Sequence, residues 1–339
     1  MRTKGGRIRF TVAAVVLCLT WAAVAGASPD LDFYQGKVIN YIVATKPGGG
    51  YDAYARLIGK YMQKQIPGVT VIVKNMPGAG HIVGANETYL AKADGLTIGT
   101  FNNGLIYSQI VGFQGLKFDL TKYSWIGKAS NETRVLIVGV KAPYKTFKDI
   151  LDSKEPIKMA ASGVGTSAYN DVLITAAATG APLKVIPGYG GREGEMAMMR
   201  GEVAGQIGSY IGLTGFIKAK ECRVLLQIAA KKHKDLSEVP LAAELKISDK
   251  AKKILAVIEG TAELGRLTAA PPRVPAGRLQ VLRDAYKKAL NDPALLKEAA
   301  KMDLDIDPGY GEEVARLVKS AINQPQENME ILKKIIKVE

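Results

Sequence analysis

Short apolar runs rich in β-branched residues alternate with helical patterns from residue 38 to residue 270. Strands that are joined through helices pair in parallel, and helices then cover both faces of the sheet. The alternation therefore predicts an α/β fold with largely parallel sheets. We expect strands at residues 38–44, 69–73, 97–100, 134–140, 157–161, 183–186, 203–207, 224–228 and 265–269.

The sequence changes after Pro271, where only helical patterns remain. Proline cannot donate a helical hydrogen bond, so Pro325 predicts a break in the last of these helices. Helices are expected at residues 275–290, 293–302 and 311–336. A helical tail of this length must pack against one of the sheets.

The start of the chain has the pattern of a secretory signal. Residues 1–9 contain basic but no acidic residues, and the apolar run 10–23 follows them. Small residues at 25–27 predict cleavage after Ala27 and export to the periplasm. An uncleaved anchor is the alternative, because the apolar stretch just reaches the length of about 17 residues that a spanning helix needs.

The length after this signal suits two domains of about 100–200 residues each. We place the crossovers between them near Glu132 and Gly265. This predicts a discontinuous first domain at residues 28–132 plus 265–339, and a continuous second domain at residues 133–264. Cys222 is the only cysteine outside the predicted signal, so cores rather than an internal disulfide must stabilise both domains.

Two glycine-rich loops, each set between an expected strand and an expected helix, are the candidate binding elements. The first is Gly48-Gly49-Gly50, and the second contains Gly78 and Gly80. Glycine lets the backbone approach a ligand closely, and the start of a helix offers free N–H groups and a partial positive charge. Loops that follow neighbouring parallel strands face one crevice. We therefore predict an anion site there, with tight structural turns as the alternative.

The first loop also fits a dinucleotide-binding pattern, because residues 48–53 match G-x-G-x-x-[GA]. That pattern requires an acidic residue at the end of the second strand, and residues 73–75 contain none. Lys74 could accept a 2′-phosphate, so an exported NAD(P)-dependent enzyme stays an alternative.

Other catalytic patterns are absent from the sequence. His81 and His233 have no second ligand at metal spacing, and we interpret both as ordinary surface or turn residues. Ser162 lacks the preceding glycine of a nucleophile elbow. We therefore expect no enzyme, no metal and no cofactor.

The formal charge of +14 suits an acidic ligand. Nucleic acid would also be attracted by this charge, but the lysines are scattered and no base-stacking aromatic pattern accompanies them. We interpret most of these lysines as solvated helix faces.

A family resemblance rests on a series of short motifs and on their order and spacing along the chain. The motifs are residues 47–52 with Ala55 and Arg56, and residues 71–80, 93–97, 161–167, 187–190, 201–203 and 270–275. Together they resemble the substrate-binding proteins of tripartite tricarboxylate transporters, also called the Bug or TctC family. The resemblance covers nearly the whole chain after the predicted signal.

The resemblance implies a periplasmic-binding-protein-like clam of type II, with two α/β domains and a ligand cleft between them. It also implies capture of a small carboxylate, either a di- or tricarboxylate or an aromatic acid, by backbone amides and domain closure. The expected partners are the membrane subunits of the transporter, and we expect a monomer that binds no nucleic acid. A ligand-sensing receptor of the same fold is the alternative.

The expected ligand-binding residues come from the loops of both domains. They are Gly49, Gly50, Tyr51, Asp52, Gly78, Ala79, Gly80, Phe101, Asn102, Asn103, Ser162, Gly163, Val164, Gly165, Thr166, Ser167, Gly188, Tyr189, Gly190 and Gly191. Departures from the family pattern at Tyr169-Asn170, Tyr189 and Gly208-Ser209 prevent the ligand's identity from being carried over.

Overall fold

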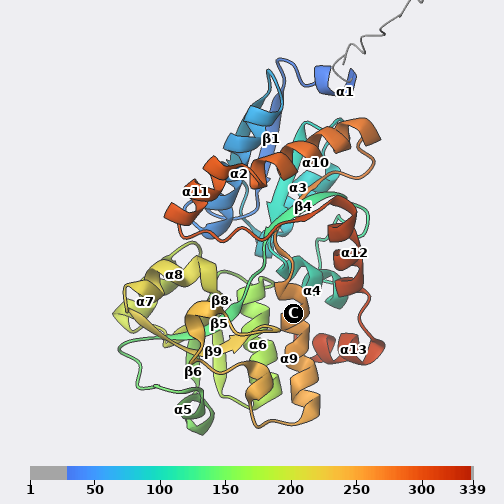
Figure 1. The fold of residues 1–339 in the computed structure, drawn as a ribbon. Helices are drawn as coiled ribbons and strands as arrows, with labels where there is room; N and C mark the ends of the chain where they lie inside the picture. The colour runs from blue at the N-terminus through green and yellow to red at the C-terminus, as the bar shows by residue number, and fades with distance from the viewer. Residues whose placement is uncertain (1–28, 337–339) are drawn as a thin grey trace, which may run out of the picture.

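The computed structural model describes residues 29–336, which form two halves, each built around one sheet (Figure 1). We call the part around the six-stranded sheet the first half and the part around the five-stranded sheet the second half. The predicted signal at residues 1–27 lies outside the described residues. No helix in the described range is long and apolar enough to cross a membrane.

The sheet of the first half has the strand order β11-β4-β10-β3-β1-β2. Its strands are β1 (Val38–Val43), β2 (Thr70–Asn75), β3 (Thr97–Phe101), β4 (Ser124–Ser130), β10 (Gly265–Ala270) and β11 (Gly309–Tyr310). β1 pairs in parallel with β2 and β3. β10 runs antiparallel between β3 and β4, and β11 pairs antiparallel with β4.

The sheet of the second half has the order β7-β6-β8-β5-β9. Its strands are β5 (Arg134–Gly139), β6 (Ile157–Ala161), β7 (Leu183–Pro187), β8 (Gly205–Ser209) and β9 (Cys222–Ile228). β6 pairs in parallel with β7 and β8, whereas β5 is antiparallel to both β8 and β9. The α/β fold class is therefore confirmed. Both sheets are mixed, because β10 and β11 in the first sheet and β5 in the second run opposite to the other strands.

Helices cover the first sheet. They are α1 (Pro29–Asp32), α2 (Gly50–Gln65), α3 (Ile82–Leu90), α4 (Gly104–Val111), α10 (Ala276–Leu290), α11 (Pro293–Lys301) and α12 (Gly311–Ile322), with the short 3₁₀ helix η1 (Ala79–His81) before α3. α2 buries Leu57, Ile58, Tyr61 and Met62 at helical spacing and packs on β1, β2 and α10. It ends before Gly68, whose φ of 71° suits a residue without a side chain.

The second sheet is flanked by α5 (Phe147–Asp152), α6 (Ser167–Thr179), α7 (Glu193–Arg200), α8 (Tyr210–Lys218) and α9 (Asp249–Ala262), with η2 (Lys234–Leu236) and η3 (Ala242–Glu244) near β9. Local signals start these helices. Thr146 forms a capping box with Asp149 at α5, and Ser248 caps α9 through Ala251 N. The free thiol of Cys222 is buried at the start of β9.

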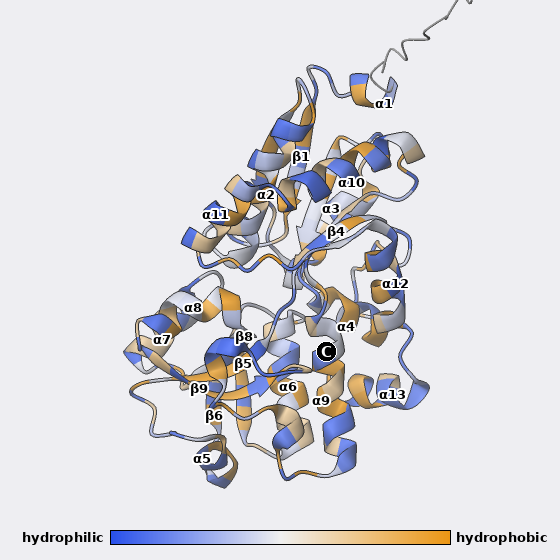
Figure 2. Ribbon diagram, viewed as in Figure 1, coloured by the Kyte–Doolittle hydropathy of each residue, from blue (hydrophilic) through white to orange (hydrophobic). Residues whose placement is uncertain are grey.

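The last helix, α13 (Gln326–Ile335), packs against α4, α6 and α9, beside α9 in Figure 1. The chain therefore reaches the second half again after α12. α4 also lies against α6, and it is mainly hydrophobic (Figure 2). Its Leu105 and Tyr107 share one buried cluster with Leu136 and Ile207 of the second sheet. An apolar core thus joins the two halves on this side.

The two halves are connected by adjacent crossovers between β4 and β5 and between α9 and β10. Glu132 N donates to the carbonyl of Ala262 at 2.7 Å, and Gly265 pairs with Ser130 in the first sheet. A side chain at Gly265 would lie 2.5 Å from the carbonyl oxygen of Ser130. These two segments therefore run in direct contact, and we call this region the hinge. The segment between α12 and α13 makes a third connection between the halves.

Candidate binding cleft

A cavity of about 610 Å³ lies between the loops that follow β1, β2 and β3 and the loops that follow β6 and β7. This volume suits a small-molecule ligand, because ligand sites commonly measure about 300–1,000 Å³. We call it the main cavity. Its predicted lining residues are Gly49, Gly50, Tyr51, Gly78, Ala79, Gly80, Asn102, Ser162, Gly163, Val164, Thr166, Gly190 and Gly191.

Other residues of the wall were not expected from the sequence. They are Ala44, Thr45, Lys46, Pro77 and His81. Conversely, several expected residues do not line the main cavity, namely Asp52, Phe101, Asn103, Gly165, Ser167, Gly188 and Tyr189. Phe101 is fully buried beside Tyr123 and Trp125 in the core. The side chain of Asn103 donates to the carbonyl of Thr261 at 2.6 Å.

Asp52 fixes the first glycine loop from within. One of its carboxylate oxygens accepts hydrogen bonds from Gly48 N and from Arg56 Nε, both at 3.0 Å, and the other accepts from Asn75 at 2.9 Å. Burial alone would raise the pKa of Asp52, but these hydrogen bonds outweigh burial and lower it. Asp52 therefore holds the loop in place, while the side chain does not reach the cavity wall.

The start of α2 offers free donors to the main cavity. Its N-cap residue is Gly49, which has no side chain to accept from the first amides of the helix. The first N–H groups of a helix have no partner within the helix, so the amides of Gly50 and Tyr51 stay available at its positive end. These two residues line the cavity.

The second glycine loop has an unusual backbone. Gly78, Ala79, Gly80 and His81 all have positive φ values, of 145°, 43°, 60° and 82°. Positive φ is uncommon for residues with a side chain, and such strain gathers at functional sites. A side chain at Gly80 would lie 2.4 Å from the carbonyl oxygen of Val164 in the second half. The loop therefore touches the opposite wall directly.

His81 is buried in the cavity wall, with 7% of its surface exposed. Of the two interpretations, surface or turn residue, the first is wrong, whereas His81 does lie in a turn at the end of η1. The ring lies edge to face with Tyr51 at 5.8 Å between centroids, and Nδ1 has no hydrogen-bond partner. Burial lowers the pKa of His81 to about 4, with Glu132 raising it and Arg266 lowering it further. The imidazole is therefore neutral at physiological pH.

This burial predicts a pH dependence of stability. The unfolded chain binds a proton at His81 near pH 6.5, whereas the folded protein does so only near pH 4. The stability that neutral His81 contributes is therefore fully present above pH 6.5, and it is lost as the pH falls towards 4. We expect about 2 kcal/mol less stability at pH 5 than at pH 7 from this residue. Urea unfolding of wild type and His81→Asn at both pH values measures it, and an equal pH loss in both would contradict it.

Asn102 ties the two halves together across the cleft. Its Oδ1 accepts from Gly104 N at 2.8 Å and from Ser167 N at 3.0 Å, and its Nδ2 donates to the hydroxyl of Tyr51 at 3.1 Å. Thr166 Oγ1 in turn accepts from Tyr169 N at 3.4 Å. The starts of α4 and α6 are therefore capped by side chains of the protein itself.

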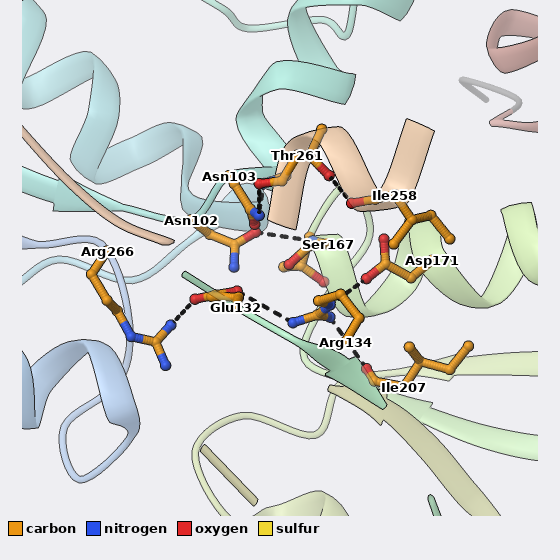
Figure 3. Close-up of polar contacts among 12 residues, drawn as sticks. Asn102, Asn103, Glu132, Arg134, Ser167, Asp171, Ile207, Ile258, Thr261 and Arg266 are labelled. Carbon is orange, nitrogen blue, oxygen red and sulfur yellow. Dashed lines mark hydrogen bonds and ion pairs between the residues drawn. The ribbon is translucent and has the colours of Figure 1, made fainter. Parts of the chain in front are cut away.

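A buried ion-pair network lies at the hinge (Figure 3). Glu132 pairs with Arg266 and, at 3.4 Å, with Arg134, and Arg134 Nε donates to Asp171 at 2.7 Å. The hydroxyl of Tyr51 donates to Glu132 at 3.0 Å, and the Arg266 guanidinium stacks 4.2 Å from the Tyr51 ring. Burial raises the pKa of Asp171 to about 6, so above this pH the two acids and two bases balance and the network carries no net charge.

A second chamber of about 170 Å³ adjoins the main cavity, and six residues line both: Gly50, Tyr51, Asn102, Ser162, Thr166 and Gly191. Its charged lining residues are Glu132, Arg134, Glu195 and Arg266, and it also contains the predicted residues Ser167 and Tyr189. Tyr51 is therefore one of the residues that border both chambers. No group of residues suited to a metal ion occurs in the described part of the chain.

Residues 54–336 match the family described as "Tripartite tricarboxylate transporter family receptor". Among curated relatives, the UPF0065 protein in the tcbD-tcbE intergenic region of Pseudomonas sp. strain P51 is 25% identical, over 92% of this chain and 90% of its own length. BugT of Bordetella pertussis is 25% identical over 69% of this chain and 73% of its own length.

Solved structures show the same fold. The periplasmic binding protein BugD superposes with a TM-score of 0.76 at 20% identity, covering 90% of this chain and 99% of its own. MatC from Rhodopseudomonas palustris, with bound malate, superposes with a TM-score of 0.71 at 19% identity, covering 89% of this chain and 99% of its own. An adipate-bound protein of R. palustris gives 0.73 at 18%, covering 89% and 98%. The chain therefore belongs to the tripartite tricarboxylate transporter receptor family of solute-binding proteins, and it is not an enzyme.

Proposed function

We propose that this protein captures a small carboxylate in the main cavity in the periplasm and presents it, as a monomer, to the membrane subunits of a tripartite tricarboxylate-type transporter. The observation that carries the proposal is the free start of α2 in the cavity wall. Free amides at the positive end of a helix favour an anion. Malate and adipate, which occupy two structures of the same fold, are both small carboxylates.

The proposed mechanism is closure of the two predicted domains, residues 28–132 plus 265–339 and residues 133–264, around the ligand, with α13 of the first domain packed on the second half. A helix end contributes about 0.3–2 kcal/mol to anion binding, whereas micromolar affinity requires about 8 kcal/mol. Closure supplies more by excluding water, which strengthens each amide-to-carboxylate bond. Such closure makes an ion pair at the mouth of the cleft, where Lys46 Nζ lies 3.1 Å from the carboxylate of Glu193 in the second half.

The charge of the ligand tests this function. For any acid that binds, the neutral amide of the same acid should bind at least about tenfold more weakly, because a charge-assisted hydrogen bond is roughly twice as strong as a neutral one. Affinity should stay nearly constant between about pH 6 and 8, since backbone amides do not titrate and His81 stays neutral in this range.

A thermal-shift screen of mono-, di- and tricarboxylates and aromatic acids finds the binders, and calorimetry then compares each acid with its amide. Ligand at 100 times its Kd should add about 2.7 kcal/mol of stability. Equal affinities of acid and amide would contradict the carboxylate assignment while leaving the family assignment untouched.

A further inference from the structure

We propose that the hydroxyl group of Tyr51 positions the carboxylate-binding amides of α2, because it ties the start of this helix to the opposite wall of the cleft. The inference rests on the proposed function and names the residue that holds its binding amides in place. Tyr51 is the second residue of α2, so its own amide belongs to that free start. The residue is buried, with 8% of its surface exposed, although it borders both chambers.

A first link runs from the Tyr51 hydroxyl through Asn102 to the second half. Asn102 Nδ2 donates to the hydroxyl at 3.1 Å, and Asn102 Oδ1 accepts from Ser167 N at 3.0 Å (Figure 3). Ser167 is the first residue of α6, and Thr166 before it lines the main cavity. Two hydrogen bonds therefore connect the start of α2 with the wall that the second half contributes.

A second link runs from the same hydroxyl through the hinge. The hydroxyl donates to Glu132 at 3.0 Å. Glu132 pairs with Arg134 of β5 at 3.4 Å, and Arg134 Nε donates to Asp171 of α6 at 2.7 Å (Figure 3). Both links therefore end on α6, so the start of α2 is fixed relative to that helix at two points.

The ring of Tyr51 is held independently of its hydroxyl. The Arg266 guanidinium lies 4.2 Å from the ring centroid, and the ring of His81 lies edge to face at 5.8 Å. A side chain at Gly50 would lie 3.0 Å from Arg266 Nη2, so the same guanidinium also packs against the backbone at the start of α2. Replacing Tyr51 by phenylalanine should therefore keep this packing and break only the two links.

Two ion pairs between the halves are, by contrast, exposed. Lys46 pairs with Glu193, and Lys218 pairs with Asp303, through side chains that are between 42% and 60% exposed. Solvent and salt screen such pairs, which contribute little to a fixed geometry. Hydrogen bonds in a buried environment are stronger and costly to leave unmade. The buried links at Tyr51 therefore determine where the amides of α2 lie against the opposite wall.

Calorimetry of Tyr51→Phe tests the inference, with Tyr54→Phe as the matched control. Tyr54 lies on the same helix, is buried and also stacks on Arg266, but its hydroxyl donates to the carbonyl of Asp305 within the first half. The probe is the tightest-binding acid of the carboxylate screen, which includes malate, adipate and benzoate, together with the neutral amide of that acid.

The acid and its amide should respond differently to the loss of the Tyr51 hydroxyl. Tyr51→Phe should bind the acid at least about tenfold more weakly but the amide less than about threefold more weakly, because misplaced amides lose most with a charged acceptor. Tyr54→Phe should leave both affinities within about twofold of wild type. Thermal unfolding of both variants shows whether they lose stability equally.

An unchanged preference for the acid over the amide in Tyr51→Phe would overturn this inference alone. Failure of every acid to bind the wild-type protein would overturn the proposed function as well. Asn102→Ala then tests the first link. Adding Tyr51→Phe to Asn102→Ala should weaken acid binding less than Tyr51→Phe does in the wild-type protein, because that link is already broken. An equal loss in both backgrounds would overturn the role of Asn102.

Discussion

Replacing Gly80 by alanine should weaken ligand binding at least about 1,000-fold, which corresponds to about 4 kcal/mol. The added carbon would lie 2.4 Å from the carbonyl oxygen of Val164 in the second half. That oxygen belongs to the backbone and cannot rotate away, so the halves would have to stay apart. A ligand can hold them closed only through its higher affinity for the closed state, and the clash removes that difference.

The control for this variant is Gly180→Ala. Gly180 also has positive φ, 73° against 60° for Gly80, but nothing lies within 4 Å of an added side chain. Both variants therefore carry the backbone cost of a left-handed alanine, about 1–2 kcal/mol, and only Gly80→Ala carries the contact. Calorimetry and thermal unfolding of both separate the two effects. Near-normal affinity of Gly80→Ala would show that the loops do not meet in the bound state.

Substitutions at the other loop glycines would act through different contacts. We expect Gly49→Val and Gly78→Val to abolish binding as well. A side chain at Gly49 would reach 3.9 Å from Gly191 across the cleft, so a valine there obstructs closure. At Gly78 the nearest atom, at 2.7 Å, belongs to Val83 of the same turn. Gly78→Val therefore distorts its own loop, and Gly80 is the cleaner probe of closure.

Glu132→Gln should lower the free energy of unfolding by about 3–5 kcal/mol, because it leaves the buried guanidinium of Arg266 without its counter-charge. Glutamine can still accept from Tyr51, so the loss measures charge rather than shape. The control is Glu312→Gln, which removes the ion pair of an exposed carboxylate, 2.8 Å from Arg283. Such a surface pair contributes about 0–1 kcal/mol. Urea unfolding compares both variants, and equal small losses would contradict a structural role of the network.

A second variant separates lost attraction from uncompensated charge. If the cost of Glu132→Gln comes from the buried cation that remains, then Glu132→Gln combined with Arg266→Met should be more stable than Glu132→Gln alone. A double variant that loses stability additively would show instead that each side chain acts independently.

The sequence predicted most of the elements because the local signals agree with the fold. The helices after Pro271 begin and end within about two residues of their predicted bounds. The predicted break near Pro325 separates α12 from α13, because proline cannot donate a helical hydrogen bond. β4 was missed. Its segment contains Gly127 and Lys128, which are uncommon in strands, so tertiary contacts rather than local propensity determine that it forms a strand. The ring of Tyr286 packs where a side chain on Gly127 would lie, and Lys128 is buried with its amine bonded to Asn131.

The candidate site was predictable where one segment carries the whole signal. Glycines between a strand and a helix predict close backbone approach, and both predicted loops do line the main cavity. Partners distant in the sequence were not predictable. Asn102 caps α6, 65 residues further on, and Glu132 pairs with Arg266 across 134 residues. The burial of His81 was not predicted, because a lone histidine in a loop has no sequence signal for burial, which depends on Tyr51 and the opposite wall.

The buried thiol of Cys222 makes optical measurement of opening and closing straightforward. Burial raises the pKa of Cys222 to about 12, so almost no thiolate, the form that reacts with labelling reagents, is present at neutral pH. Cysteines introduced at exposed Leu90 on α3 and Met199 on α7 would then take up a donor and an acceptor dye, one on each half. Energy transfer between the dyes would follow the separation of the halves in real time, without removal of the native cysteine.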